Sequence, residues 1–342
     1  MIEILNPTEH ATWNEMLLAS HQYSFFHSSE WARVLQDTYQ YKPLYFTIKD
    51  EGRIKTLLPV MEVESILTGK RGVSLPFSDT SEPMAANNED FETVFRYALA
   101  YGRKRGWKYL ELRDESSYLD REQESQLFWG HSLDLSKGSK EIFSGMREST
   151  RRNIKKAAKE NVNIEISFSA EAMEQFVQLN SMTRREHGLP PQPHSFFRNV
   201  QKNIIEKNMG FIALASFQNW VIASVVFFLL GDKALYKYGA SDRTFQNFRA
   251  NNLVMWHAIQ WCCDNGYKTL CFGRTEQDNS GLRQFKAGWG VEERSIRYYH
   301  YDLQKNAFVK KMPGISVQKR IVEHLPISVL NAAGTMLYRH MG

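Results

Sequence analysis

The stretch NLVMWHAIQWCCDNGYKTLCFGR (residues 252–274) decides the fold, because FETVFRYALAYGRKRGWKYLELR (residues 91–113) repeats its order of features. Each begins with apolar residues at the three- and four-residue spacing of an amphipathic helix. A glycine and an aromatic residue follow, and then a short apolar strand that ends in Arg113 or Arg274. Two copies of one helix–strand unit indicate an internal duplication.

Similar patterns surround both copies. Before the first copy we expect helices at residues 8–20 and 28–39 and a hairpin at residues 43–63. Before the second copy we expect a longer series, namely a helix at 139–161, a strand at 162–169, helices at 170–188 and 195–208, a hairpin at 211–230 and a strand at 233–242. The sequence therefore predicts an α/β (α+β) chain with two tandem domains, each a mixed sheet flanked by helices.

One apolar stretch, residues 210–232, could be mistaken for a membrane span. Gln218 and Asn219 divide it into two runs of strand length, and β-branched and aromatic residues dominate the second run. We therefore expect a hairpin with buried strands.

The composition is that of a globular protein, since 42% of the residues are hydrophobic and 24% are charged. The formal net charge of +5 suits an anionic ligand without requiring one. The three cysteines (Cys262, Cys263 and Cys271) are odd in number and lack zinc-ligand spacing. We therefore expect reduced thiols, no metal site and a cytoplasmic protein. The N-terminus has neither the basic nor the apolar region of a signal peptide.

A band of cations lies on the helix expected at residues 139–161. It comprises Arg147, Arg151, Arg152, Lys155, Lys156 and Lys159. Four-residue spacing puts several of them in one stripe of the helix surface. Such a band could bind a diphosphate, a nucleic-acid backbone or anionic lipid, and it could equally be a solvated helix face.

A second candidate is the start of the helix in residues 252–274. Asn251 or Asn252 is a good N-cap residue, and the preceding loop carries Arg243 and Arg249. Because the amides at a helix N-terminus attract anions, these residues are candidates for binding the phosphates of a donor. Simple capping of the helix is the alternative.

The third candidate is Lys286, in GRTEQDNSGLRQFKAGWG (residues 273–290), where we expect a loop after a strand that ends at Arg274. Gly288 and Gly290 allow a tight backbone path, and aromatic neighbours supply apolar walls. A lysine that is partly desolvated there could direct its charge at a developing oxyanion. The alternative is a lysine that snorkels over an aromatic ring.

Other residues carry weaker signals. His187 could act as a general base, although a lone loop histidine usually does not. Asp79 could bind a substrate amine or serve only in a turn. Tyr236 and Tyr238 alternate on a strand, which usually indicates packing.

Six segments together resemble the FemAB-like proteins, which carry two tandem GNAT-type acyltransferase domains with mostly antiparallel sheets. They are SFFHSSEWARVLQDTYQYKP (24–43), RGVSLPFSD (71–79), RRNIKKAAKENV (151–162), TRREHGLPPQPHSFF (183–197), YKYGASD (236–242) and CFGRTEQDNSGLRQFKAGWG (271–290). The resemblance implies an N-terminal GNAT-like domain on the acceptor side at residues 1–138. It also implies a second GNAT-like domain at residues 139–308 that carries Lys286, followed by an amphipathic helical extension at residues 309–342.

The resemblance implies that the protein transfers an acyl or aminoacyl group from acyl-CoA or aminoacyl-tRNA, used as a co-substrate, to an amine of a cell-envelope precursor. No tightly bound cofactor is implied. Lys286 matches the family lysine that is tied to catalysis. The candidate acceptor-binding residues are Asp79, Arg184, Arg185, Tyr238 and Arg274. Relatives that bind a nucleotide-linked muropeptide have a phosphate-binding lysine at the position of Leu35, so the sequence departs from the family there.

The alternative function is a non-catalytic protein that binds RNA or an anionic membrane. Its support is the cation band and the C-terminal segment 316–342, where apolar residues alternate with Lys319, Arg320 and Arg339. A helix of this kind could lie on the inner membrane face or pack on the body of the protein. The sequence leaves the oligomeric state open.

Overall fold

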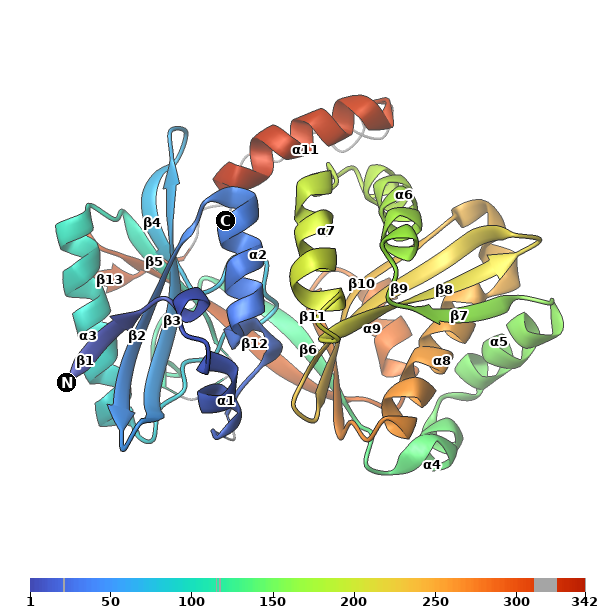
Figure 1. Cartoon of the computed structure of the whole chain (residues 1–342), viewed down its shortest axis with the longest axis horizontal. Coiled ribbons are helices and arrows are strands. Elements are labelled where there is room, and N and C mark those ends of the chain that lie inside the picture. Colours follow the sequence, from blue (N-terminus) through green and yellow to red (C-terminus); the bar gives the residue numbers. More distant parts are fainter. Residues whose placement is uncertain (21, 115, 117, 311–324, 342) are drawn as a thin grey trace. The chain divides into compact units, whose positions relative to one another are not determined.

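The computed structural model describes residues 1–20, 22–114, 116, 118–310 and 325–341. The chain divides into two compact units, and Figure 1 shows their elements. Unit 1 comprises residues 1–128, 295–314 and 336–342, and unit 2 comprises residues 129–294 and 315–335. The chain passes between the units within strand β6 (Gln126–Asp134) and again within strand β12 (Glu292–Asp302).

Unit 1 consists of a sheet with helices. Its helices are α1 (Trp13–Leu18), α2 (Ser29–Tyr39) and α3 (Asn88–Arg105), and its strands, besides β12, are β1 (Ile2–Leu5), β2 (Lys42–Asp50), β3 (Arg53–Ser65), β4 (Gly69–Val73), β5 (Tyr109–Asp114) and β13 (Ala307–Phe308). The strand order is β1-β2-β3-β4-β5-β12, antiparallel except for β4 and β5. The apolar face of α3, including Phe91, Val94 and Ala98, is buried on this sheet.

Unit 2 repeats the plan. Its helices are α4 (Gly138–Gly145), α5 (Glu148–Lys159), α6 (Ala170–Glu186), α7 (His194–Val200), α8 (Ala250–Asp264) and α9 (Ser280–Ala287), and its strands are β7 (Asn163–Ser167), β8 (Gly210–Phe217), β9 (Trp220–Leu230), β10 (Lys233–Ser241) and β11 (Thr269–Glu276). The order is β7-β8-β9-β10-β11, antiparallel except for β10 and β11. Helix α8 is buried on most of its surface and packs against α5 and the sheet.

The duplicated helix–strand unit is present in both halves. Each helix is followed by a glycine in the left-handed region, Gly106 (φ 74°) after α3 and Gly266 (φ 82°) after α8. The strand that follows then pairs in parallel with the strand before the helix, with Gly72 opposite Leu110 and Ala234 opposite Leu270. The predicted fold class, mixed sheets flanked by helices, is confirmed.

Residues 210–232 form the expected antiparallel hairpin of β8 and β9, and the strands are largely buried. Among the described residues, no helix is both long and apolar enough to cross a bilayer. The C-terminal helix α11 (Ile327–Met341) includes Arg339, whereas Lys319 and Arg320 lie outside the described residues.

Three local predictions of secondary structure were wrong. The single helix expected at residues 139–161 is broken into α4 and α5, because Met146 is extended and its side chain is buried in the core. Lys286 lies on the helix α9 and not in a loop, since the Asn279 side chain accepts a hydrogen bond from Leu282 N and begins the helix there. Strand β11 continues past Arg274 to Glu276.

Candidate active site in unit 2

The two parallel strands of unit 2 part soon after they begin. Only Lys233 to Leu235 of β10 pair with Thr269 to Cys271 of β11. Beyond this point the pairing of β10 with β9 shifts register between Tyr236 and Tyr238, so Lys237 is an extra, bulged residue. A parallel pair that ends after three residues leaves room between the carboxyl ends of its strands.

Two small cavities lie around this end of β10. The strand cavity, of about 240 Å³, is lined by Thr183, His187, Val225, Tyr236, Gly239, Ala240, Ser241, Asn251, Met255, Leu282 and Phe285. The helix cavity, of about 170 Å³, is lined by Ile222, Ala223, Ser241, Asp242, Phe245, Gln246, Arg249, Ala250, Asn251, Asn252 and Phe285. Ser241, Asn251 and Phe285 line both, so the two cavities adjoin.

The helix cavity lies at the N-terminus of α8. The residue before the helix is Arg249, in the left-handed region at φ 58°, so the expectation that Asn251 or Asn252 caps the helix is wrong. Asn251 lies in the first turn instead, and its amide donates to Ser241 Oγ at 3.0 Å. Arg249, Asn251 and Asn252 line the cavity, whereas Arg243 is exposed and does not. A 15-residue helix directs its positive end at this cavity.

The bulge at Lys237 separates the two tyrosines of β10. Tyr236 lines the strand cavity, and burial raises its pKa to about 12. Its hydroxyl lies against Gly239, where any Cβ would overlap it. Tyr238 packs on the other face of the sheet, with its ring 5.6 Å from that of Phe197 and 6.2 Å from that of Phe228. The candidate acceptor residue Tyr238 therefore does not line the strand cavity.

The end of α6 closes one side of the strand cavity. The Thr183 hydroxyl accepts from Ser241 N and donates to Ser241 O, both at 3.2 Å, and this joins α6 to the end of β10. Arg184 and Arg185 follow in the last turn and are half-buried, and Arg184 Nε donates to Pro190 O at 3.4 Å. His187 ends the helix and lines the cavity.

Lys286 is held beside the end of β11. Its side chain is almost fully buried, with 2% exposed, and its Nζ donates to Gly273 O at 3.1 Å and to Arg274 O at 2.9 Å. The alternative of a snorkelling lysine is therefore wrong. The residue before it, Phe285, lines both cavities, so α9 presents adjacent residues to the cavities and to the end of β11.

Sequence reasoning missed His131, a buried residue of β6. Burial and, after it, the positive charge of Lys286 lower the pKa of His131. Its Nε2 lies 3.1 Å from Glu293 Oε2, and Glu293 also accepts two hydrogen bonds from Arg283. The neutral histidine and the buried lysine thus share one electrostatic environment. No motif around His131 signals this, because the two residues are 155 positions apart in the chain.

Glycines let the start of α5 pack against the end of α9. Arg147 N donates to Gly288 O at 3.0 Å, and a Cβ on Gly288 would lie 2.5 Å from the Thr150 hydroxyl. Gly290, at φ 76°, lies against the carbonyl of Gly145. The glycines of the FKAGWG segment therefore allow the start of α5 to pack against the end of α9, the helix that carries Lys286.

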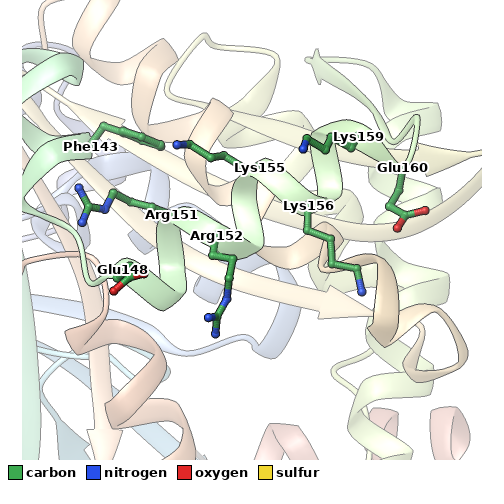
Figure 2. Close-up of a pocket in the computed structure, with 8 residues that line it drawn as sticks. All are labelled: Phe143, Glu148, Arg151, Arg152, Lys155, Lys156, Lys159 and Glu160. Carbon is green, nitrogen blue, oxygen red and sulfur yellow. The ribbon is translucent and has the colours of Figure 1, made fainter.

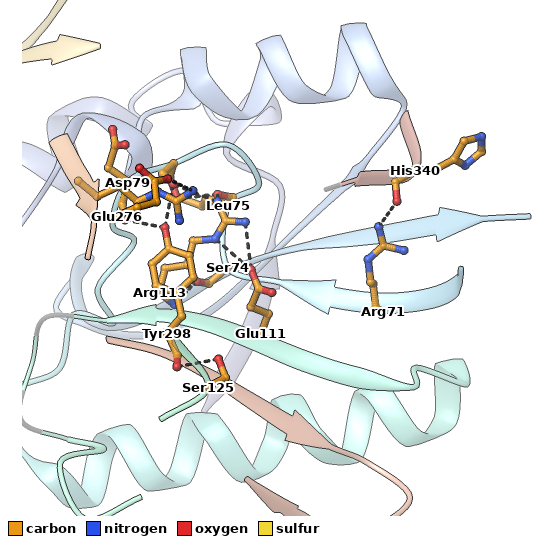
Figure 3. Close-up of polar contacts among 12 residues, drawn as sticks. Arg71, Ser74, Leu75, Asp79, Glu111, Arg113, Ser125, Glu276, Tyr298 and His340 are labelled. Atoms are coloured by element: carbon orange, nitrogen blue, oxygen red, sulfur yellow. Dashed lines mark hydrogen bonds and ion pairs between the residues drawn. The ribbon is translucent and has the colours of Figure 1, made fainter. Parts of the chain in front are cut away.

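The other candidate residues are divided between the units. Arg274 lies on β11, half-buried, with its guanidinium 3.8 Å from Glu276. Asp79 lies in unit 1, where its carbonyl accepts from the Tyr298 hydroxyl at 2.8 Å (Figure 3). Arg113 of β5 donates to two carbonyl groups of the same loop, Leu75 O and Ser78 O, and also pairs with Glu111. The loop of Asp79 is therefore fixed by polar contacts of unit 1.

The cation band lines an open groove of about 760 Å³ along α5, which Figure 2 shows. The lining residues are Phe143, Glu148, Arg151, Arg152, Lys155, Lys156, Lys159 and Glu160. Arg147 lies at the start of α5 and does not line it. The three cysteines are unpaired, as expected, and no group of three potential metal ligands occurs among the residues the structure describes.

Comparison with known proteins finds a family match in the second half of the chain. Residues 144–287 match the family described as acetyltransferase (GNAT) domain. The lipid II:glycine glycyltransferase of Staphylococcus haemolyticus (strain JCSC1435) is 29% identical over 99 residues, which are 27% of this chain and 24% of the glycyltransferase. The chain thus matches about a quarter of the length of this relative.

Solved structures extend the similarity of fold to both units. FemX superposes with a TM-score of 0.69 at 13% identity, over 87% of this chain and 96% of FemX. L-PGS from Bacillus licheniformis gives 0.55 at 12% identity, over 90% and 94% of the two chains. A tandem GNAT protein from the clavulanic acid biosynthesis pathway gives 0.52 at 9% identity, over 89% and 98%. Residues 144–287 therefore match the acetyltransferase (GNAT) domain family, and the chain as a whole has the fold of FemX and of the tandem GNAT protein.

Proposed function

We propose that the protein transfers an acyl or aminoacyl group from an activated donor, acyl-CoA or aminoacyl-tRNA, to an amine of a cell-envelope precursor. The observation that carries this proposal is the early parting of β10 and β11, with two adjoining cavities at the N-terminus of α8. This arrangement lies within the residues that match the acetyltransferase (GNAT) domain.

In the proposed reaction the acceptor nitrogen attacks the carbonyl carbon of the donor ester or thioester. The tetrahedral intermediate carries a negative oxygen, and its collapse forms the amide, expels the alkoxide or thiolate and releases the proton of the amine. Arg249, Asn251 and Asn252, with the N-terminus of α8, would hold phosphate groups of the donor. The carboxylate of Asp242 is turned to the Thr244 amide and hydroxyl, so it is already hydrogen-bonded within its own loop.

Lys286 would stabilise the negative oxygen. Because its side chain is 98% removed from solvent, its charge is poorly screened and acts strongly on a nearby anion. The carbonyl groups of Gly273 and Arg274 fix its position before any substrate binds. A cation that is already in place needs no reorganisation when charge develops in the transition state.

A cell-envelope acceptor is supported by the relative named lipid II:glycine glycyltransferase. The binding mode of nucleotide-linked muropeptides would differ from that of relatives with a lysine at position 35. Leu35 is fully buried in the core of unit 1, so this position does not face a ligand. Arg33 donates to Thr8 O at 2.6 Å and does not take over the role of that lysine.

The test is transfer by the purified full chain. Acetyl-CoA and a charged tRNA are offered side by side with a lipid-linked or nucleotide-linked muropeptide, and the acceptor is analysed by mass spectrometry. We expect transfer from one donor, and we expect Lys286→Met to reduce turnover by about 10²- to 10³-fold while donor affinity is retained.

The melting temperature of Lys286→Met shows whether a loss of turnover comes from the missing ammonium group or from unfolding of the variant. Removal of the ammonium leaves two carbonyl groups without their donor, which costs about 1–3 kcal/mol and is visible as a lower melting temperature. If neither donor supports transfer by the wild-type chain, the enzyme proposal falls, and a non-catalytic binder of RNA or membrane takes its place.

A further inference from the structure

A chain of three side chains ties α9 to two strands of the sheet in unit 2. Arg283 of α9 donates two hydrogen bonds to Glu293 of β12, from Nε to Oε2 at 2.8 Å and from Nη2 to Oε1 at 2.6 Å. His131 of β6 lies next to the same carboxylate, with Nε2 3.1 Å from Oε2. The Arg283 guanidinium also lies 4.1 Å from the centre of the Trp129 ring, on the same strand. Three elements that are distant in the sequence therefore meet at one carboxylate.

The burial of this chain increases from the helix toward the sheet. The Arg283 side chain is 41% exposed and the Glu293 side chain 29%, whereas the side chain of His131 is fully buried. Two parallel hydrogen bonds between a guanidinium and a carboxylate fix the geometry of both groups. An ion pair that remains partly in contact with water adds little stability. The pair of Arg283 and Glu293 therefore contributes orientation more than stability.

The surroundings of His131 favour a neutral ring with its proton on Nε2. The Nδ1 atom is buried and has no hydrogen-bond partner among the residues that the structure describes. A proton on Nε2 donates to Glu293, whereas a second proton on Nδ1 would be buried without an acceptor. The charged groups that face the ring are Lys286 and Arg283 of α9 and Glu293 of β12. Burial and, after it, the charge of Lys286 lower the pKa of His131, and Glu293 offsets only part of this effect.

The same helix carries the buried lysine of the candidate active site. Lys286 follows Arg283 by three residues, so both side chains leave α9 on the same side. The lysine is hydrogen-bonded to the carbonyl groups of Gly273 and Arg274 on β11, and β6 lies between β11 and β12 in the sheet. Helix α9 is therefore fixed to the sheet at two points. With the lysine contact alone, the helix could turn about it and displace the ammonium group.

We propose that His131, Glu293 and Arg283 are positioning residues that set where α9 holds the ammonium group of Lys286. They act through the helix and through the uncharged ring beside the lysine, and they are not catalytic residues. That this position governs acyl transfer rests on the function proposed above. The coupling between His131 and Lys286 does not depend on that function.

The first experiment measures the pKa of His131 in the full chain by NMR of isotope-labelled histidine rings. His131→Gln identifies the His131 signal among the ten histidines. Lys286→Met should raise the pKa of His131, because it removes a neighbouring positive charge. Glu293→Gln should lower this pKa, because it removes the negative charge that favours the protonated ring. A signal that titrates identically in the wild type and both variants, or in none of them, would overturn the inference.

The second experiment measures transfer by Arg283→Gln, which removes the two hydrogen bonds to Glu293 and leaves Lys286 in the chain. We expect turnover to fall by about 10- to 100-fold, while KM for the donor stays within about threefold of the wild type. Arg283→Lys should restore only part of the turnover, because an ammonium group keeps the charge but cannot form the two parallel hydrogen bonds. A rise in KM without a fall in turnover would contradict a positioning role.

Unit 1 supplies a matched control for this variant. Arg105 donates two hydrogen bonds to Glu62, at 3.0 and 2.7 Å, and Trp107 Nε1 is a third donor to that carboxylate at 2.7 Å. The side chain of Arg105 is 40% exposed, compared with 41% for Arg283. Arg105→Gln removes an equivalent pair, and its turnover should stay within about threefold of the wild type. Equal losses of turnover in the two variants would overturn the inference, because they would follow from a general loss of stability.

The two experiments separate this inference from the proposed function. If the wild-type chain transfers nothing, the proposed function falls, and the titration of His131 still decides whether the chain of side chains is coupled to Lys286. If the wild type transfers and Arg283→Gln transfers at the same rate, the inference falls and the proposed function stands.

Discussion

At the scale of single residues, Asp114 at the end of β5 gives unit 1 a pH-dependent weakness. The residue is buried, with 1% exposed, and burial raises the pKa of its carboxyl to about 6 from the usual 3.8. A carboxyl with a raised pKa in the folded state contributes stability that is complete below the unfolded pKa and is lost as pH rises through the folded value. The free energy of unfolding therefore falls between about pH 4 and pH 6, where this carboxyl is ionised in the unfolded chain but still protonated in the folded protein.

We predict that Asp114→Asn stabilises the protein above pH 6, by about 1–2 kcal/mol at pH 7. The asparagine oxygen can still accept from Ser116 N, which is 2.7 Å from the carboxylate in the wild type. Urea unfolding at pH 4 and pH 7 checks this, and the two proteins should differ little at pH 4. An equal effect at both pH values would show that packing, and not ionisation, is responsible.

At the scale of elements, the packing of α5 on α9 depends on Gly288. We predict that Gly288→Ala destabilises the protein by about 1–3 kcal/mol, because its Cβ would overlap the Thr150 hydroxyl. Adding Thr150→Ala removes that overlap, so the double variant should lose less stability than the sum of the single variants. Urea unfolding of the four proteins gives this coupling.

Gly281 supplies the matched control for that cycle. It lies in α9, the helix that Gly288 directly follows, but a Cβ there would meet nothing within 4 Å. Gly281→Ala should therefore stabilise the protein by about 0.5–1 kcal/mol through the helix propensity of alanine. If Gly288→Ala behaved like Gly281→Ala, the close approach of the two helices would be refuted.

The elements also show how far the sequence predicts the fold and where it stops. The helix–strand units of α3 with β5 and α8 with β11 follow from apolar spacing and from Gly106 and Gly266. Strands β6 and β12 do not, because buried polar residues such as His131 interrupt the apolar alternation that marks a strand. The break at Met146 was missed because methionine continues a helical apolar pattern, and tertiary contacts decide its extended backbone.

For the candidate site, proximity in the sequence predicts only which neighbouring residues lie together. It places Arg249, Asn251 and Asn252 together, as the helix cavity does. It cannot give the parting of β10 from β11, which depends on the bulge at Lys237 and on pairing with β9. It also cannot give the buried position of Lys286, whose partners are backbone carbonyls that no side-chain pattern reveals.

At the scale of the whole molecule, unit 1 is completed by a strand from the far end of the chain. Strand β12 pairs with β5, with Arg297 opposite Asp114 and Tyr299 opposite Leu112. We predict that a chain ending at residue 294 loses the unfolding transition of unit 1, while a chain ending at residue 310 keeps it. Circular dichroism and calorimetry of the two truncations decide this, and two intact transitions in the shorter chain would contradict it.

This discontinuity affects the newly made protein on the ribosome. At roughly 5–20 residues per second, the partner of β5 emerges about 10–40 s after β5 itself. During that interval β5 pairs only with β4, on one of its edges. The hydrogen-bonding groups on its other edge, which later pair with β12, could pair with another nascent chain. Most of unit 2, in contrast, is one continuous segment of the chain, residues 129–294, so its strands emerge one after another. Expression at high ribosome density should therefore favour aggregation through the first half, and slower initiation should relieve it.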